Sequence, residues 1–318
     1  MTSGYPTVGA RVAAAVCGPV RVMAFLRMAV AAFAAATATP LAAAGGVEPD
    51  RIVRDVVYLT AGDRALHLDL YLHPDARKAP APLLVHFHGG GWARGTRPES
   101  WTGFRAYVDA GFSLATVQYR LAGEGRAPAA VQDARCALHW LGANAGRLGI
   151  DPRRIVVTGT SSGGHLALMA GLLPPKSGID LEACRDAPRA AAIVDFYGPA
   201  DLTAARAAGG RVHPTIANWI GPRRDADAMI RLMSPVTWAS ADSPPVFIAH
   251  GDADPVVPLS QSEGLKARLD ALGVASELHI VAGGGHGRFE PAARAAMTAR
   301  ALAFLCAHGL PAARACKN

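Results

Sequence analysis

Two adjacent serines lie in the glycine-rich stretch GTSSGG at residues 159–164. The apolar, strand-like sequence RRIVVTG leads into this stretch, and the helix-like sequence HLALMAGLL follows it. A strand that turns sharply into a helix forces the central residue into strained backbone angles, and small flanking residues relieve the crowding. Ser161 is the central residue of this G-x-S-x-G pattern, so we predict that it is a nucleophile. The alternative is a purely structural turn.

A serine hydroxyl is a weak nucleophile, so it needs a base and a carboxylate that orients the base. In this kind of strand-to-helix site the chain order is serine, acid, histidine. His286, in AGGGHGRF, follows the last predicted strand and is the expected base. Asp252 and Asp254 both follow the preceding strand. We favour Asp254 as the acid, because a turn before Pro255 can aim its carboxylate at the histidine, whereas Asp252 is expected to brace the turn.

Donors for a developing oxyanion are predicted in VHFHGGGWARG, residues 85–95. Glycines after an apolar strand let backbone N–H groups approach a substrate, so Gly90, Gly91 and the N–H of Ser162 are the expected oxyanion hole. A phosphate cradle is disfavoured because neither G-K-[ST] nor G-x-G-x-x-G is present. Trp92 either walls an acyl pocket or packs in the core.

These residues need a scaffold that brings strand ends together. From about residue 50, strand-like and helix-like segments alternate, and most strands are continuously apolar, which is typical of a parallel sheet covered on both faces. The segment 199–235 is expected to cover the carboxyl end of this sheet. We predict one α/β domain over 50–310. Its predicted strands are 54–60, 66–73, 82–88, 113–121, 153–159, 190–198, 244–251 and 276–283, and its predicted helices are 104–112, 129–149, 162–173, 261–272 and 292–307.

The N-terminal segment 1–44 has the features of a targeting sequence. Arg27 precedes an apolar run that is short for a membrane span, and alanines at 42–44 offer a cleavage site. Met23 is an alternative start. We therefore expect an exported protein, periplasmic or secreted, without stable membrane insertion after processing.

The composition favours a folded domain and argues against nucleic-acid binding. The chain has 318 residues, of which 51% are hydrophobic and 18% charged. The net charge is +7, but the basic residues are scattered and aromatic residues amount to only 6%. Four cysteines follow the targeting segment, and the sequence leaves open which of three pairings they form. We expect structural roles for them, and none has metal-ligand spacing. The four are Cys136, Cys184, Cys306 and Cys316.

Several motifs occur in an order that resembles a known family. They are HGGGW, VQYRL, GTSSGGHLAL, DFYGPADL, SPVTWASADSPPVFIAHGDADPVVP and GGGHGRF. Together, over about residues 50–308, they resemble the α/β-hydrolase esterases of the hormone-sensitive-lipase and feruloyl-esterase-like (BD-FAE-type) group. The resemblance implies an α/β-hydrolase fold, with a mostly parallel sheet, helices on both faces and a short lid-like insertion.

The resemblance also implies a Ser161–Asp254–His286 triad and no metal or cofactor. Ser162 stands where relatives commonly carry alanine, and Arg288 departs from the family pattern at the pocket rim. The expected activity is hydrolysis of small or short-chain acyl esters through an acyl-enzyme. Two alternatives stay open: an arylformamidase, amidase or peptidase with the same triad, and a non-catalytic binding module that kept the fold.

Overall fold

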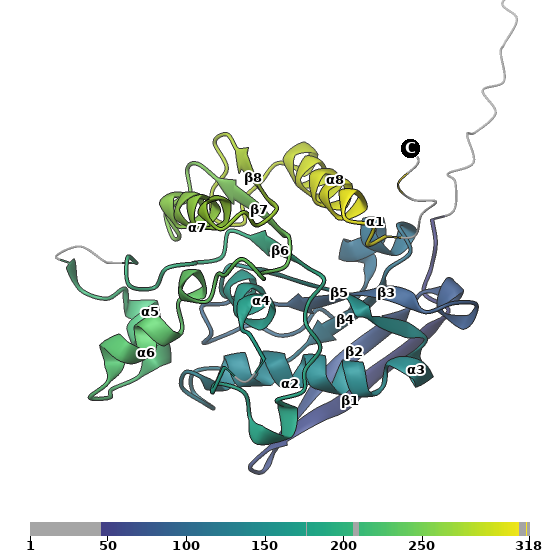
Figure 1. Ribbon diagram of the computed structural model, residues 1–318, viewed down its shortest axis with the longest axis horizontal. Coiled ribbons are helices and arrows are strands. Elements are labelled where there is room, and N and C mark those ends of the chain that lie inside the picture. Colours follow the sequence, from purple (N-terminus) through teal and green to yellow (C-terminus); the bar gives the residue numbers. More distant parts are fainter. Residues whose placement is uncertain (1–45, 176, 206–209, 312–315, 317–318) are drawn as a thin grey trace, which may run out of the picture. The chain divides into compact units, whose positions relative to one another are not determined.

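An eight-stranded sheet organises the part of the chain that the computed structural model describes, residues 46–318 except 176, 206–209, 312–315 and 317–318 (Figure 1). The strand order is β1-β2-β4-β3-β5-β6-β7-β8. Strand β2 pairs antiparallel with both of its neighbours, and all pairs from β4 to β8 are parallel. The strands are β1 (Arg51–Ala61), β2 (Arg64–Leu72), β3 (Ala81–Phe87), β4 (Ser113–Val117), β5 (Ile150–Thr160), β6 (Ala192–Phe196), β7 (Val246–Gly251) and β8 (Ser276–Val281).

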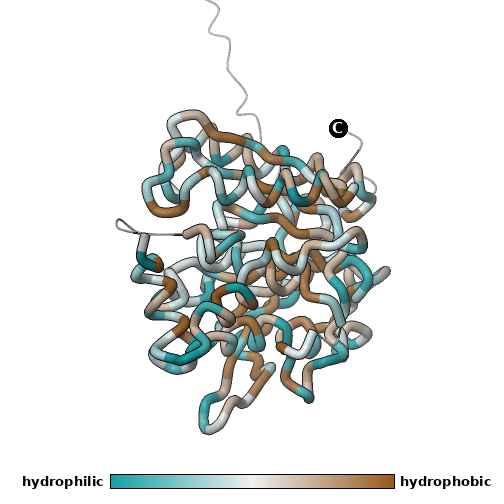
Figure 2. The backbone as a smooth tube through the Cα atoms, turned by 60° about the vertical axis from the view of Figure 1, so that its left-hand side comes forward, coloured by the Kyte–Doolittle hydropathy of each residue, from teal (hydrophilic) through white to brown (hydrophobic). Residues whose placement is uncertain are grey.

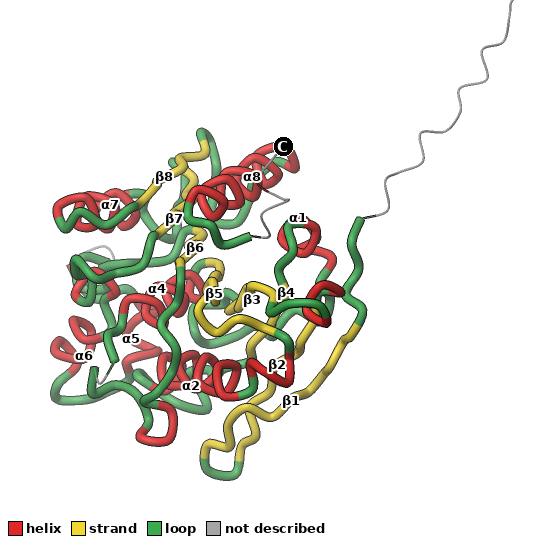
Figure 3. The backbone as a smooth tube through the Cα atoms, turned by 45° about the vertical axis from the view of Figure 1, so that its right-hand side comes forward, coloured by secondary structure: helices red, strands yellow, loops and turns green. Residues whose placement is uncertain are grey.

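Helices cover both faces of the sheet, because its parallel strands are apolar on both sides. One hydrophobic cluster lies between the sheet and α2, α4 and α7, and a second lies between the sheet and α1 and α8. Figure 3 shows β1 and β2 at one edge and β8 at the other. The α-helices are α1 (Arg105–Asp109), α2 (Ala129–Ala143), α3 (Ala145–Leu148), α4 (Ser162–Leu172), α5 (Pro214–Ile220), α6 (Ala226–Leu232), α7 (Ser260–Ala271) and α8 (Pro291–Ala307).

The predicted fold class is confirmed, and every predicted strand and helix is present, with some changed ends. The predicted helix 129–149 is divided at Asn144, whose side chain donates to the carbonyl of Trp140 (2.7 Å) and ends α2. The predicted strand 113–121 stops at Val117, since the N–H of Arg120 bonds to the Asp133 carboxylate (2.8 Å) instead of a strand.

Residues 45–318 form one compact unit. The targeting segment expected at 1–44 lies outside the described residues, so it stays a prediction. Figure 2 shows hydrophobic and hydrophilic stretches interspersed along the described chain. No helix among the described residues is both long and apolar enough to cross a membrane.

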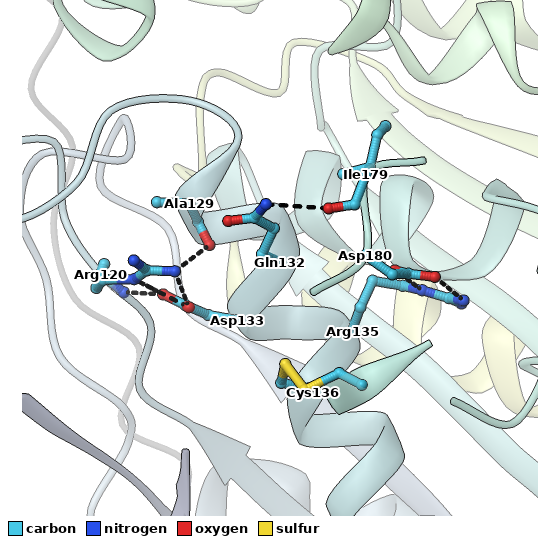
Figure 4. Close-up of a disulfide and its surroundings, with 9 residues drawn as sticks. Arg120, Ala129, Gln132, Asp133, Arg135, Cys136, Ile179 and Asp180 are labelled. Carbon is cyan, nitrogen blue, oxygen red and sulfur yellow. Dashed lines mark hydrogen bonds and ion pairs between the residues drawn. A yellow bond between two sulfur atoms is a disulfide. The ribbon is translucent and has the colours of Figure 1, made fainter. Parts of the chain in front are cut away.

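The structure pairs Cys136 with Cys184 and Cys306 with Cys316. Figure 4 shows the first disulfide on α2, near the ion pair of Arg135 with Asp180. In addition, the side chain of Gln132 donates to the carbonyl of Ile179 (3.0 Å). These contacts attach the segment before β6 to α2. Short 3-10 turns lie at Pro74–Arg77, Thr102–Phe104, Glu182–Cys184 and Pro235–Thr237.

The Cys136–Cys184 disulfide is expected to stabilise the fold more than the Cys306–Cys316 disulfide. The first closes a separation of 48 residues and the second only 10. In the chain-entropy treatment, replacing the first pair by alanines costs about 4 kcal/mol of unfolding free energy, against about 3 kcal/mol for the second. Urea titrations of the two double-alanine variants measure both values. A larger loss for the Cys306–Cys316 pair would contradict the prediction.

Candidate active site

Ser161 occupies the strained turn that its sequence context predicts. Strand β5 ends at Thr160 and α4 begins at Ser162, so Ser161 alone makes the turn, with φ 55° and ψ −123°. A Cβ on Gly163 would lie 2.1 Å from the carbonyl oxygen of Phe87, so only glycine allows α4 to begin this close to β3. A non-glycine residue at positive φ is costly and persists only where its surroundings enforce it. The turn therefore presents the Ser161 hydroxyl above the carboxyl end of the sheet.

His286 and Asp254 complete a hydrogen-bonded chain with Ser161. The Ser161 Oγ lies 2.8 Å from His286 Nε2, and His286 Nδ1 lies 2.7 Å from Asp254 Oδ2. Ser161 follows β5, Asp254 follows β7 and His286 follows β8. Parallel strands place their carboxyl ends at one edge of the sheet. The structure thus joins residues that are up to 125 positions apart in the sequence.

The Asp254 carboxylate is buried but well supplied with donors. Its Oδ1 accepts the N–H groups of Val256 (2.8 Å) and Val257 (2.9 Å), and its side chain has no exposed surface. Burial alone would raise the pKa of Asp254, but hydrogen bonds from His250, His286 and the two N–H groups hold the pKa well below its ordinary value. An ionised Asp254 directs the His286 proton to Nδ1 and leaves Nε2 free to accept the Ser161 proton.

Asp252, the competing acid candidate, is placed elsewhere. Its Oδ1 accepts the N–H of Gly283 at 2.6 Å, which ties the loop after β7 to the loop after β8. No contact of Asp252 with His286 is formed within hydrogen-bond distance. Asp252 therefore braces the loop, as expected, but through the backbone of the neighbouring loop and not through that of its own turn.

The loop after β3 reaches the same cavity as Ser161. Gly90 and Gly91 have φ of 134° and 62°, and a Cβ on Gly90 would lie 1.9 Å from the carbonyl oxygen of Arg94. Both glycines, together with Ser162, line the cavity that contains Ser161 and His286. The N–H of Ser162 is in the first turn of α4 and has no acceptor within the helix. The three residues predicted to supply oxyanion donors thus line the same cavity as Ser161.

Trp92 lines the cavity and also packs in the core, so the two positions predicted as alternatives are both observed. Its indole is 2% exposed and stacks on Trp219 of α5, with ring centroids 4.4 Å apart. Its Nε1–H donates to His165 Nδ1 (3.3 Å), and His165 Nε2 donates to the carbonyl of Met233 (2.7 Å). Burial lowers the pKa of His165 to about 4, which keeps it neutral for these two bonds. The loop after β3, which carries Trp92, is thereby fastened to α4 and α5.

The cavity has a volume of about 870 Å³. Part of its wall comes from the segment 199–235, including His213, the N-cap of α5, and Thr215 and Ile216 within that helix. The ring of Tyr197, a residue at φ 46°, meets the His286 ring edge-on at a centroid distance of 5.1 Å. The size is at the upper end of the range for small-molecule sites.

Comparison with known proteins identifies the family of this chain. A model of the BD-FAE family matches residues 68–269, more than half of the chain. The chain belongs to the BD-FAE family. The matched range includes Ser161 and Asp254.

Two similar proteins carry esterase names. This BD-FAE protein is 31% identical over 256 residues to the esterase LipQ of Mycobacterium tuberculosis, covering 78% of this chain and 60% of LipQ. The chain thus spans less than two thirds of the length of LipQ. A truncated carbohydrate esterase from gut microbiota superposes with a TM-score of 0.68 and 27% identity, covering 83% of this chain and all of the other.

A third relative was solved with a ligand. The thermophilic esterase Est2 of the planctomycete Thermogutta terrifontis, bound to butyrate, has a TM-score of 0.66 and 26% identity, covering 84% of this chain and 96% of the other. The same esterase 2 was also solved phosphonylated by sarin, with 25% identity and a TM-score of 0.66, covering 83% of this chain and 98% of the other.

Sequence reasoning missed several residues around the site of this BD-FAE protein. Tyr197, Trp219, Asp195 and His250 come from four different elements or loops, and no spacing rule links them to GTSSGG. The family-like motif DFYGPADL contains Asp195 and Tyr197, which was the available signal. Among the described residues, no group of three or more histidine, cysteine or acidic side chains could hold a metal ion.

Asp195 of β6 is a buried carboxyl beneath the Ser161 turn. It has no exposed surface, its Oδ1 accepts the N–H of Gly198 (3.1 Å), and its Oδ2 has no hydrogen-bond partner. Burial raises the pKa of Asp195 to about 7, against smaller opposing effects of His250 and the Gly198 N–H. The folded protein therefore binds a proton here that the unfolded chain releases near pH 4.

Asp195→Asn is accordingly expected to stabilise the protein only at higher pH. Because the folded-state pKa is raised, the stability contributed by protonated Asp195 is present below about pH 4 and is lost as the pH rises to about 7. Above pH 7 the variant should exceed wild type by on the order of 1–4 kcal/mol, with no difference near pH 4. Urea titrations across this range measure it, with the exposed Asp63→Asn as control. A pH-independent difference would refute the expectation.

Proposed function

We propose that this BD-FAE protein is a serine carboxylesterase that hydrolyses small or short-chain acyl esters. The observation that carries the proposal is the hydrogen-bonded chain Ser161–His286–Asp254, with distances of 2.8 and 2.7 Å, at the wall of a cavity that Gly90 and Gly91 also line. The esterase names of its relatives support the bond type. The butyrate-bound relative supports a short acyl group.

The proposed mechanism follows the contacts of the site. His286 takes the proton of the Ser161 hydroxyl as the oxygen attacks the ester carbonyl, and Asp254 stabilises the imidazolium. The oxyanion of the tetrahedral intermediate binds to the N–H groups of Gly90, Gly91 and Ser162. His286 then gives its proton to the leaving alcohol, and water repeats the sequence on the acyl-enzyme. The phosphonylation of a relative by sarin supports a nucleophile of this kind.

A substrate panel tests the proposal. p-Nitrophenyl esters from acetate to decanoate, a sugar acetate, a feruloyl ester and an aryl formamide are compared by kcat/KM. We expect the acetate to butyrate esters to be hydrolysed fastest and the formamide at least about 10-fold more slowly. A preference for the formamide would favour the arylformamidase alternative. A fluorophosphonate probe that leaves the protein unlabelled would favour a binding module.

We also propose that the protein is exported. The apolar N-terminal run supports this, as does the pairing of all four cysteines that follow residue 44, since disulfides persist in oxidising compartments. N-terminal sequencing of the protein recovered from its native host is the test. A mature chain that starts near residue 45 is expected, and a chain that retains Met23 would contradict export by cleavage.

A further inference from the structure

His250, at the end of β7, makes three polar contacts but touches no reacting atom. Its side chain has no exposed surface. Its Nδ1 lies 2.6 Å from the Oγ of Ser262 on α7, and its Nε2 lies 2.8 Å from the carbonyl oxygen of Val257. The same Nε2 is 3.4 Å from Oδ2 of Asp254. The imidazole therefore lies between α7 and the loop that carries the acid.

These partners determine where the His250 proton resides. A backbone carbonyl and a carboxylate can only accept hydrogen bonds, so Nε2 must carry a hydrogen toward Val257 and Asp254. The Ser262 hydroxyl can donate or accept, and it donates to Nδ1 when that nitrogen carries no hydrogen. Both ring nitrogens are thus satisfied in the neutral ring, and Ser262 selects the tautomer that donates toward Asp254.

Asp254 Oδ2 is consequently shared by two imidazoles. It receives His286 Nδ1 at 2.7 Å and faces His250 Nε2 at 3.4 Å, while Oδ1 takes the two valine N–H groups. His250 also holds the carbonyl of Val257, whose own N–H binds Asp254. His250, Val257 and Asp254 thus form a closed ring of polar contacts, and His250 anchors this ring on strand β7.

We propose that His250 is a positioning residue for the reaction: its Nε2–H holds both the loop and the carboxylate of Asp254, and so sets how strongly that carboxylate binds His286. This inference rests on the proposed function for its catalytic consequence. The position of Asp254 and the ionisation of the site can be measured without any substrate. The positioning role of His250 and the proposed function can therefore fail separately.

Two acidic side chains face His250, and Asp254 determines the sign of the effect. Asp254 faces it from the loop after β7, and Asp195 faces it from β6, where Asp195 pairs with Ile248 and so shares a sheet face with His250. Ser262 of α7 and the ring of Tyr197, 6.5 Å away between centroids, are the neutral neighbours. Removing the Nε2–H leaves more negative charge on Asp254 toward His286. The protonated form of His286 then persists to higher pH.

Two substitutions at this position form a matched pair. In His250→Gln the side-chain amide nitrogen reaches about where Nε2 lies, so the donor to Val257 and Asp254 is kept. In His250→Asn the amide reaches only as far as Nδ1, so the contact with Ser262 can persist but the donor to Asp254 is lost. Ser262→Ala removes the partner that selects the tautomer, and a smaller effect in the same direction as His250→Asn is expected.

The pH titration of His286 is followed by NMR on histidine-labelled protein, with His286→Gln used to assign the signal. In His250→Asn we expect the midpoint to rise by about 0.5–1 unit and kcat for p-nitrophenyl acetate to fall about 10- to 100-fold with little change in KM. In His250→Gln both should return to within about threefold of wild type. Should His250→Asn not fold, His250→Met, which has nearly the same shape as the glutamine variant but no donor, replaces it.

Each outcome is decisive. An unchanged His286 midpoint in His250→Asn or His250→Met overturns the proposal, as does a glutamine variant that behaves like the asparagine variant. If wild type hydrolyses no ester, the proposed function fails, and the NMR comparison still decides whether His250 controls the site.

Discussion

Ser161→Ala is expected to lower kcat/KM for p-nitrophenyl butyrate by about 10⁴- to 10⁶-fold, with KM changed little. The alanine methyl group cannot attack the carbonyl, while the cavity and the amides of Gly90 and Gly91 stay in place to bind substrate. The variant should still hydrolyse the ester faster than water alone does, because substrate binding and the oxyanion donors remain. Steady-state kinetics on the purified variant measure the loss.

Ser162→Ala is the matched control for that variant. The two serines are adjacent, but Ser162 is 1% exposed and its expected part in the reaction is its backbone N–H, which alanine keeps. Its kcat/KM should remain within about tenfold of wild type. Fluorophosphonate labelling should be lost in the Ser161 variant and kept in the Ser162 variant. Wild-type turnover by Ser161→Ala would exclude the proposed nucleophile.

Asp254→Asn should have the second largest effect, a loss in kcat of about 10³- to 10⁴-fold. The substituted amide can turn its nitrogen toward His286 Nδ1, which forces the proton to Nε2 and deprives Ser161 of its acceptor. The variant should also be less stable near pH 7. Because hydrogen bonds depress the pKa of Asp254, the stability it contributes is present above about pH 4 and is lost only as the pH falls through its low folded-state value.

Asp252→Asn, two residues away in the same loop, is the control. Its oxygen can still accept the N–H of Gly283, which it meets at 2.6 Å in the wild-type protein. We expect kcat within about threefold of wild type and a similar pH profile. If Asp252→Asn were the more damaging of the two, the acid would have been assigned to the wrong residue.

The pairs Ser161/Ser162 and Asp252/Asp254 illustrate what adjacent residues in the sequence can predict. The glycines around Ser161 favoured it over Ser162, and the proline after Asp254, together with the family resemblance, favoured Asp254 over Asp252, since backbone strain and turn geometry depend on adjacent residues. The alternation of apolar strands and helices was sufficient for a mostly parallel sheet, and parallel strands bring their carboxyl ends, and hence Ser161, Asp254 and His286, to one edge. In these respects the sequence by itself determined the fold class and the candidate triad.

Tertiary structure decided what depends on contacts between distant elements. The pairing of Cys136 with Cys184 follows from the docking of residues 179–184 on α2, which no spacing of cysteines encodes. Likewise, Trp92 acquires its place only when α5 brings Trp219 against it. His250 looks like any strand histidine until Ser262 and Asp254 approach its two ring nitrogens. Periodicity and turn signals are local, whereas burial and hydrogen-bond partners arise only when the whole chain has packed.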